Sequence, residues 1–331
     1  MMHGASLVKL AVTALLAVQL AAAAKLSAGE ALALRGVHNS LGGTMTPAFV
    51  AQDLGLFTKH GLQHSLQYIA ATTAIQALAS GSEEIGLVGN QCVDIALEGA
   101  DLVYIADTAS RFIFQLYGDP SIKSVSDLKG KVIAATQPAA STDYAARILL
   151  RKHGLVPDKD VRIIYAGSSP ALLSMLKAGN ASAGLINAPA IYQAQELGMK
   201  QIVNVTELNI PFIFVAVCTT KRVLQQKPEA VSRYLRAYTE AISVILRDRE
   251  TALKIMGKYM KMDNRQWVEA VYNDIATVLQ RAPYMNKAAV QAVLEVVKNP
   301  KGTQVKSEDF FDNSYLQKVD SGGFINSLYP R

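Results

Sequence analysis

Small hydroxyl and amide side chains recur in this sequence where a predicted strand gives way to a predicted helix. Ligands of open α/β sheets bind at the carboxyl ends of the strands, where such turns meet. Backbone amides and hydroxyl groups at helix starts suit an anion. We therefore predict a site for a small anion among these turns. Its candidate residues are Ser40, Thr44, Met45, Thr72, Thr73, Asn90, Gln91, Arg111, Gln137, Ser141, Thr142, Ser168, Ser169 and Asn187.

Arg111 is the one cationic side chain in this set, and it follows the fourth predicted strand. A guanidinium group can hold two oxygen atoms of an anion at once. Each candidate also has an ordinary explanation. A serine or threonine at a helix start is typical of an N-cap, Met45 fits a core, and Arg111 suits a salt bridge at the surface or at a hinge. The prediction therefore depends on the position that the residues share.

The histidines do not form a catalytic or metal-binding pattern. His38, His60, His64 and His153 lie outside any HExxH or similar spacing, and the sequence has no GxSxG or GxxxxGK[ST] motif. His38 lies beside the proposed cleft, where a structural or solvated histidine is the ordinary interpretation. We therefore predict a protein without catalytic residues, metal or cofactor.

Strands and helices alternate from Leu32 to Ala106, and the alternation starts again at Val132 and continues to Val205. This pattern predicts mostly parallel sheets with helices on both faces. Thr72 or Thr73 is expected to cap the helix that follows the second strand.

The sequence from Ala74 to Val88 recurs 98 residues later, from Leu172 to Ile186. This spacing is too long for a solenoid, whose repeats are about 20–50 residues long. It predicts two similar α/β lobes with a ligand-binding cleft between them. The matching positions are Leu78 with Leu176, Gly81 with Gly179, and Gly86 with Gly184.

Two apolar segments that both begin with Phe-Ile-Phe are predicted to join the lobes, Phe112–Tyr117 and Phe212–Thr219. We expect a hinge at residues 112–117 and 212–217. Lobe 1 would then comprise residues 32–114 and 215–331, and lobe 2 residues 115–214. After Thr220 the pattern is almost entirely amphipathic helix.

The N-terminus resembles a secretory signal peptide. Lys9 precedes an apolar run, Leu10–Ala24, that ends in small residues, and a second possible cleavage site lies at residues 29–31. The run of about 15 residues is shorter than the ~20 needed to span a membrane. No cysteine adjoins either cleavage site, so we expect no lipid anchor. We predict cleavage after residue 24 and a free periplasmic monomer.

The chain of 331 residues has a formal net charge of +6 and 50% hydrophobic residues. No run of five or six basic residues occurs, so we predict no nucleic-acid partner.

Seven short motifs lie at Pro47–Ala51, Gly55–Phe57, His60–Leu62, Ala74–Gly81, Gly99–Val103, Ser126–Lys131 and Ser321–Ile325. Together they resemble motifs of the nitrate/sulfonate/taurine-type periplasmic binding proteins of ABC transporters. The resemblance implies a type II two-lobed fold that closes on a small molecule and delivers it to an inner-membrane permease with a cytoplasmic ATPase. It also implies that Thr72–Thr73 fills the small-residue turn after the second strand, although many relatives have Gly-Gly-Ser there. Ser141–Thr142 corresponds to the polar helix start in lobe 2.

The ligand class has alternatives. A sulfonate or carboxylate is the first hypothesis, and a neutral aromatic heterocycle such as a pyrimidine precursor is the second. A soluble sensor that hands its ligand to a receptor is a further possibility. The same superfamily includes an enzyme that makes the thiamin pyrimidine and is associated with clustered cysteines. The export signal and the two isolated cysteines argue against that activity.

Cys92 and Cys218 are predicted to be free, buried thiols. Cys218 would lie about six residues along a strand that leaves the hinge, or ~20 Å at the usual rise per residue. A disulfide requires Cα atoms within about 7 Å.

Overall fold

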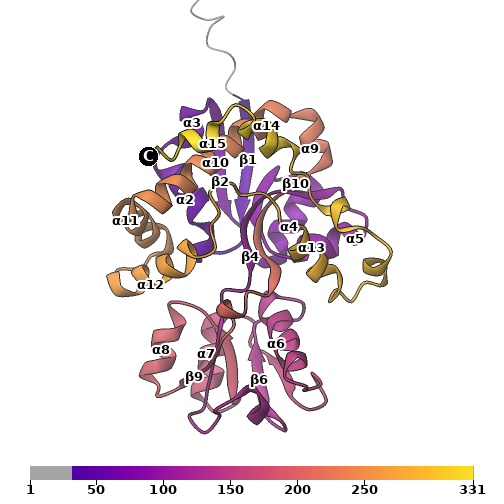
Figure 1. Cartoon of the computed structure of the whole chain (residues 1–331), viewed down its shortest axis with the longest axis vertical. Helices are drawn as coiled ribbons and strands as arrows, with labels where there is room; N and C mark the ends of the chain where they lie inside the picture. Colours follow the sequence, from indigo (N-terminus) through magenta and orange to yellow (C-terminus); the bar gives the residue numbers. More distant parts are fainter. Residues whose placement is uncertain (1–31, 331) are drawn as a thin grey trace, which may run out of the picture.

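The computed structural model describes residues 32–330, which form two α/β lobes stacked along the long axis (Figure 1). The sheet of lobe 1 has the strand order β2-β1-β3-β10-β4, and the sheet of lobe 2 has the order β7-β6-β8-β5-β9. The strands are β1 (Leu32–His38), β2 (Leu62–Tyr68), β3 (Ile85–Val88), β4 (Leu102–Arg111), β5 (Gln115–Gly118), β6 (Val132–Ala135), β7 (Arg162–Tyr165), β8 (Ala183–Ile186), β9 (Lys200–Asn204) and β10 (Pro211–Thr220).

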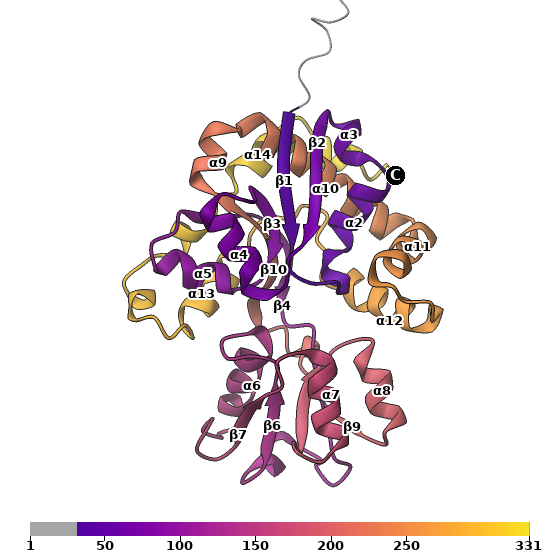
Figure 2. The same cartoon turned by 180° about the vertical axis from the view of Figure 1, so that it is seen from behind.

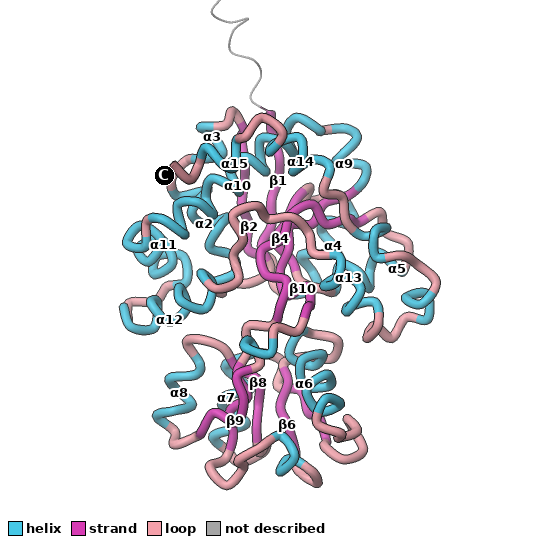
Figure 3. Tube along the Cα trace, in the orientation of Figure 1, coloured by secondary structure: helices cyan, strands magenta, loops and turns pink. Residues whose placement is uncertain are grey.

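Helices cover both faces of each sheet (Figure 3). The α-helices are α2 (Thr46–Asp53), α3 (Leu56–Lys59), α4 (Ala71–Ser80), α5 (Gln91–Leu97), α6 (Ser141–Lys152), α7 (Ser169–Lys177), α8 (Ala190–Glu196), α9 (Lys221–Gln226), α10 (Pro228–Arg247), α11 (Arg249–Met260), α12 (Arg265–Ala276), α13 (Lys287–Leu294), α14 (Ser314–Asp320) and α15 (Phe324–Ser327). Short 3-10 helices are η1 (Gly43–Met45), η2 (Val125–Leu128), η3 (Thr206–Leu208), η4 (Pro300–Thr303) and η5 (Ser307–Phe310).

The two sheets have the same topology. In lobe 1, β1 pairs in parallel with β2 and β3, and in lobe 2, β6 pairs in parallel with β7 and β8. One strand of each sheet, β10 or β5, runs antiparallel to both of its neighbours. The predicted two-lobed α/β fold is therefore confirmed, and its repeat extends to the order of the strands.

The repeated glycines explain why the two copies share a sequence. A Cβ atom on Gly86 would lie 2.6 Å from Val37 and 3.3 Å from Leu78, and one on Gly184 would lie 2.7 Å from Leu172 and 3.3 Å from Leu176. Each glycine thus lets the preceding helix, α4 or α7, approach its strand closely. Leu78 and Leu176 make the matching contact in the two lobes.

The two Phe-Ile-Phe segments lie side by side where the lobes join, as their sequence suggests. The rings of Phe112 and Phe212 stack with centroids 4.4 Å apart, and those of Phe114 and Phe214 are 5.2 Å apart. The strands around them differ from the prediction. The fourth strand continues to Arg111 instead of ending near residue 106, residues 112–114 connect β4 to β5, and the second segment lies wholly within β10 of the lobe 1 sheet.

Cys92 and Cys218 form a disulfide, so the prediction of two free thiols is wrong. The predicted separation assumed that the strand of Cys218 runs away from the strand end that precedes Cys92. Instead β10 turns back beside β3 and places Cys218 opposite Gly86. Cys92, in the first turn of α5, belongs to the same buried apolar cluster, and the two Cα atoms are 7.4 Å apart.

The predicted signal peptide lies outside the described residues. Within residues 32–330, none of the helices combines the length and apolarity that a membrane span requires. The chain after β10 is helical, as predicted, and stays with lobe 1, where α14 packs against α10.

Candidate functional site

A cavity of about 380 Å³ lies between the lobes. Lobe 1 contributes the loop after β1 and the end of α11, and lobe 2 contributes the turns that open α6, α7 and α8. Figure 2 shows these three helices below lobe 1. The lining residues are Ser40, Leu41, Gly42, Phe114, Thr136, Ala140, Ser141, Thr142, Ser169, Asn187, Ala188, Pro189, Phe214, Met260 and Met262. This volume falls within the range of small-molecule sites.

Five predicted residues line this cavity: Ser40, Ser141, Thr142, Ser169 and Asn187. They come from both lobes and from four different turns. The structure thus brings together residues that are up to 147 positions apart in the sequence.

Other predicted residues have structural roles. Thr44 and Met45 are buried in η1. Ser168 caps α7 by accepting a hydrogen bond from the Ala171 amide at 3.4 Å, and the Gln137 side chain donates to the Gly167 carbonyl at 3.2 Å. These residues shape the turns from outside the cavity lining.

The predicted threonine cap of α4 is wrong. The helix begins at Ala71, before both threonines, and its N-cap is Ala70, which has no side chain able to cap it. Thr72 and Thr73 lie in the first turn and are exposed. Gln91, at the start of α5, is partly buried and does not line the cavity.

Some polar side chains of the cavity already form hydrogen bonds within their own turns. Thr142 Oγ1 accepts a hydrogen bond from the Thr136 amide at 2.9 Å and lies 2.7 Å from the Thr136 hydroxyl. Ser40 Oγ accepts from the Gly42 amide at 2.9 Å. These bonds hold the rim of the cavity in place.

Three other polar side chains have no hydrogen-bond partner within residues 32–330. They are Ser141, Ser169 and Asn187, and all three line the lobe 2 side of the cavity. Two hydroxyl groups and an amide can both donate and accept hydrogen bonds. They are therefore available to a bound solute.

The first turn of α6 adds backbone donors to this side. Its N-cap, Ala140, makes no side-chain cap, so amides at the start of a 12-residue helix face the lobe 2 wall without a capping group. The buried Asp143 carboxylate is neutralised locally, because Arg147 Nε and the Tyr165 hydroxyl donate to it at 2.8 and 3.1 Å.

No charged side chain is among the cavity-lining residues in the described part of the chain. Arg111 lies outside the lining, where its guanidinium donates to the Asn209 side chain and to the Thr277 carbonyl. Asp274 of α12 lies near the cavity edge. Burial raises the pKa of its carboxyl group to about 6, and a hydrogen bond from the Ala188 backbone partly opposes this rise.

The apolar part of the lining was missed by sequence reasoning. Phe114 and Phe214 were recognised only as crossing segments, although they also form the back of the cavity. Met260 and Met262 lie at the end of α11, where the amphipathic pattern gives no sign that the lobe 2 surface is opposite. The repeated Phe-Ile-Phe motif was the one available signal.

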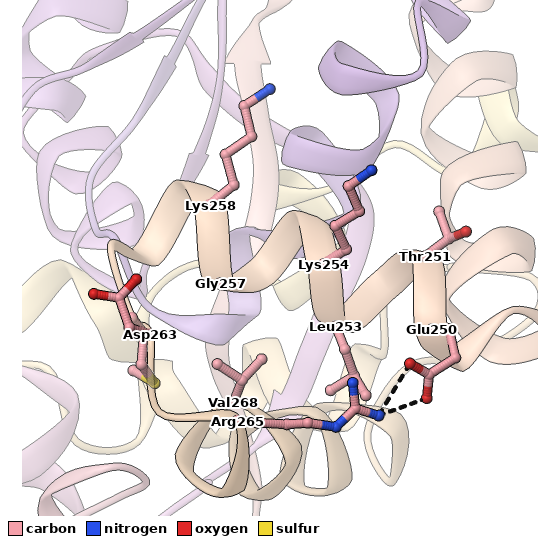
Figure 4. A pocket seen from close by; sticks show the side chains of 10 residues that line it. Glu250, Thr251, Leu253, Lys254, Gly257, Lys258, Asp263, Arg265 and Val268 are labelled. Atoms are coloured by element: carbon pink, nitrogen blue, oxygen red, sulfur yellow. Dashed lines mark hydrogen bonds and ion pairs between the residues drawn. The ribbon is translucent and has the colours of Figure 1, made fainter.

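A larger cavity of about 630 Å³ lies between α11 and α12 of lobe 1 (Figure 4). Charged side chains surround it, and several are already paired: Arg265 donates to Glu250 at 2.7 and 3.0 Å. It is open to solvent on one lobe and receives nothing from the other. The smaller interlobe cavity therefore fits a solute site better.

A family model described as NMT1/THI5 like matches residues 43–252, which is more than half of the chain. The chain belongs to the NMT1/THI5-like family. Among its relatives, a Brucella abortus protein provisionally named a binding protein is 27% identical over 221 residues, or 65% of this chain and 67% of the relative. A Brachyspira hyodysenteriae protein provisionally named an ABC transporter periplasmic binding protein is 26% identical over 209 residues, or 62% and 55% of the two chains.

Solved structures place this NMT1/THI5-like protein in the two-lobed periplasmic binding protein fold. The periplasmic aliphatic sulphonate binding protein of Escherichia coli superposes with a TM-score of 0.68, at 22% identity over 85% of this chain and 99% of that one. The periplasmic nitrate-binding protein of Synechocystis PCC 6803 gives a TM-score of 0.67, at 13% identity over 91% of each chain. The resemblance predicted from the motifs is confirmed.

Proposed function

We propose that this NMT1/THI5-like protein is the solute-binding component of an ABC importer and acts in the periplasm. The observation that carries the proposal is the interlobe cavity, whose lining includes three polar side chains that have no hydrogen-bond partner within residues 32–330. The protein would bind its solute without transforming it and present it to an inner-membrane permease driven by a cytoplasmic ATPase. The provisional name of the Brachyspira relative supports this role. The predicted signal peptide would export the chain as a monomer without a lipid anchor.

The solute that we propose is a small organic anion of the sulfonate or carboxylate class. Its oxygen atoms would accept hydrogen bonds from Ser141, Ser169 and Asn187 and from the start of α6, because these donors share one wall. Its carbon skeleton would contact Phe114 and Phe214. In this arrangement Arg111 supports the junction of the lobes and does not clamp the anion.

A neutral aromatic heterocycle is the second candidate, and one observation favours it. The lining combines two phenylalanines and two methionines with neutral hydrogen-bonding groups and includes no cation in the described residues. A heterocycle could pack on Phe114 or Phe214 and bond to the serine and asparagine side chains.

A thermal-shift screen of the mature protein over alkanesulfonates, carboxylates, nitrate and pyrimidines tests these proposals. We expect organic sulfonates or carboxylates to raise the melting temperature and nitrate to have a smaller effect, because nitrate leaves the apolar wall uncovered. Stabilisation by pyrimidines alone would favour the second candidate, and no response in any class would contradict both.

A transport assay separates an importer from a sensor. We expect a strain that lacks this protein to lose uptake of the radiolabelled solute identified in the screen. Unchanged uptake together with a lost transcriptional or motile response to that solute would indicate a sensor instead.

A further inference from the structure

Among residues 32–330, a group of buried polar atoms without hydrogen-bond partners lies on one flank of the junction between the lobes. The atoms are Asn90 Oδ1 and Asp94 Oδ2 in lobe 1 and the Tyr144 hydroxyl in lobe 2. Asn90 is fully buried and Tyr144 is only 3% exposed. Unpaired buried polar groups are costly and uncommon, so three of them in one place require an explanation.

These atoms belong to two segments that face each other across the junction. Asn90 and Asp94 are four residues apart at the start of α5, so they share one face of that helix. Asn90 Nδ2 donates to the Ala139 carbonyl of lobe 2 at 3.3 Å. Ala139 immediately precedes the start of α6, which carries Tyr144 in its first turns. Figures 1 and 2 both show α5 and α6 on the same flank of the molecule.

Tyr144 is held close to Asp94 but is not bonded to it. After burial, the charge of Asp94 is the largest influence that raises the pKa of the Tyr144 hydroxyl. The Tyr144 ring is fixed by packing on Phe212 of the crossing segment, with centroids 5.5 Å apart. A phenol is a donor and a carboxylate is an acceptor, and the two groups sit on opposite sides of the expected hinge. A small rotation of the lobes would therefore bring a matched pair into contact.

We propose that Tyr144 and Asp94 form an interlobe hydrogen bond that stabilises the closed conformation of the protein. Both act as positioning residues: they hold the lobes together and leave the solute to the cavity side chains. That closure encloses a solute rests on the proposed function, whereas the hydrogen bond itself can be tested without any solute. We call Asn90, Asp94 and Tyr144 the interlobe latch. Asn90 belongs to it because its hydrogen bond to the Ala139 carbonyl already joins α5 to lobe 2.

The surrounding charges determine how this latch responds to pH. Glu98 on α5, Tyr104 on β4, and Asp143 and Arg147 on α6 are the ionisable groups nearest to the pair. The neighbouring helix α4 has no ionisable side chain, and Lys301 of η4 bonds to the Leu97 carbonyl at the far end of α5.

In the observed arrangement, burial and then Glu98 raise the pKa of Asp94 to about 6. A hydrogen bond from Tyr144 stabilises the carboxylate, so the pKa of Asp94 is lower in the closed state. The stabilisation of the closed state is then complete above pH ~6, and it is lost as the pH falls below that value towards the lower pKa that Asp94 has in the closed state.

Single-molecule FRET on the solute-free mature protein tests the proposal. Dyes would be attached at Gln225→Cys in lobe 1 and Lys159→Cys in lobe 2, both exposed, with the native disulfide intact. We expect Tyr144→Phe and Asp94→Ala each to lower the ratio of closed to open molecules about tenfold at pH 7.5, and the double variant to be no worse than either one. Wild type should lose closed molecules between pH 7.5 and 5, and Asp94→Ala should not share that loss.

Glu98→Gln is the matched control, because it removes a neighbouring carboxylate on the same helix and leaves the pair intact. It should keep the closed fraction within about twofold of wild type. Unchanged closure in Tyr144→Phe, or additive losses in the double variant, would overturn the proposal. The circular dichroism of each variant shows that it is folded. A protein that closes through this pair but binds no compound of the screen would retain the latch and contradict only the proposed solute class.

Discussion

Ser141 and Thr142 are neighbours in the sequence, but their hydroxyl groups have different roles. The Thr142 hydroxyl is bonded to Thr136 and holds the turn. The Ser141 hydroxyl has no partner within residues 32–330, and neither do the side chains of Ser169 and Asn187. The type of residue therefore pointed to four of the turns that line the cavity, but not to the role of each side chain there.

Removing one of the unpaired donors should weaken solute binding. We expect Ser169→Ala to raise the dissociation constant about fivefold, because a single hydrogen bond contributes about 1 kcal/mol. Isothermal titration with the best compound of the screen measures this change. Ser174→Ala on the same helix is the control, because its hydroxyl bonds to the Pro170 carbonyl outside the cavity. Equal affinity of wild type and Ser169→Ala would remove this serine from the site.

Arg111→Ala separates a supporting arginine from an anion clamp. The guanidinium bonds to Asn209 and to the Thr277 carbonyl, so its loss should cost stability, by about 1 kcal/mol in a urea titration. We expect solute affinity to change less than threefold, because Arg111 does not line the cavity. A loss of affinity of a hundredfold or more, with stability unchanged, would restore the clamp interpretation.

Elements were predicted well where a short pattern determines them. The first strand, Leu32–His38, has the predicted bounds, and β3 and β8 keep the 98-residue spacing of the repeat. The disulfide was missed because it depends on β10 returning beside β3, a long-range pairing that local sequence does not reveal. Met260 and Met262 were missed for a related reason: a helix face that borders a cleft has the same apolar pattern as one that borders a core.

The equivalent glycines make the internal repeat testable. A methyl group would crowd Val37 at Gly86 and Leu172 at Gly184, so Gly86→Ala and Gly184→Ala should each lower the free energy of unfolding by about 1–3 kcal/mol. Gly322→Ala is the control, since nothing lies within 4 Å of its added Cβ. Urea denaturation compares the three variants. Stabilities that match the control would show that the close helix–strand contact does not constrain these positions.

The disulfide links α5 to β10 across 126 residues of sequence. Because a crosslink over such a loop restricts the unfolded chain, we expect reduction to destabilise the protein by about 2–4 kcal/mol. Urea titrations with and without dithiothreitol measure the effect. The Cys92→Ser/Cys218→Ser variant should resemble the reduced protein and should not respond to the reductant. Identical midpoints for reduced and oxidised wild type would argue that the bond contributes no stability.

At the scale of the whole molecule, the two lobes share one topology, and the antiparallel strand of each sheet is the first strand after the chain crosses from the other lobe. β5 follows a lobe 1 strand but lies in the lobe 2 sheet, and β10 does the reverse. The lobes therefore meet at paired phenylalanines on crossing segments, a connection that permits hinge motion. The cavity and the Asp94–Tyr144 pair both lie at this junction, so we expect solute binding and closure to use the same rotation.

The central claim is that a small solute binds between the lobes. A crystal structure of the mature protein with the best compound of the screen tests this claim most directly. We expect the solute in the interlobe cavity, in contact with Ser141, Ser169 and Asn187 and covered by Phe114 and Phe214. A solute bound in the cavity between α11 and α12, or on one lobe alone, would contradict the account.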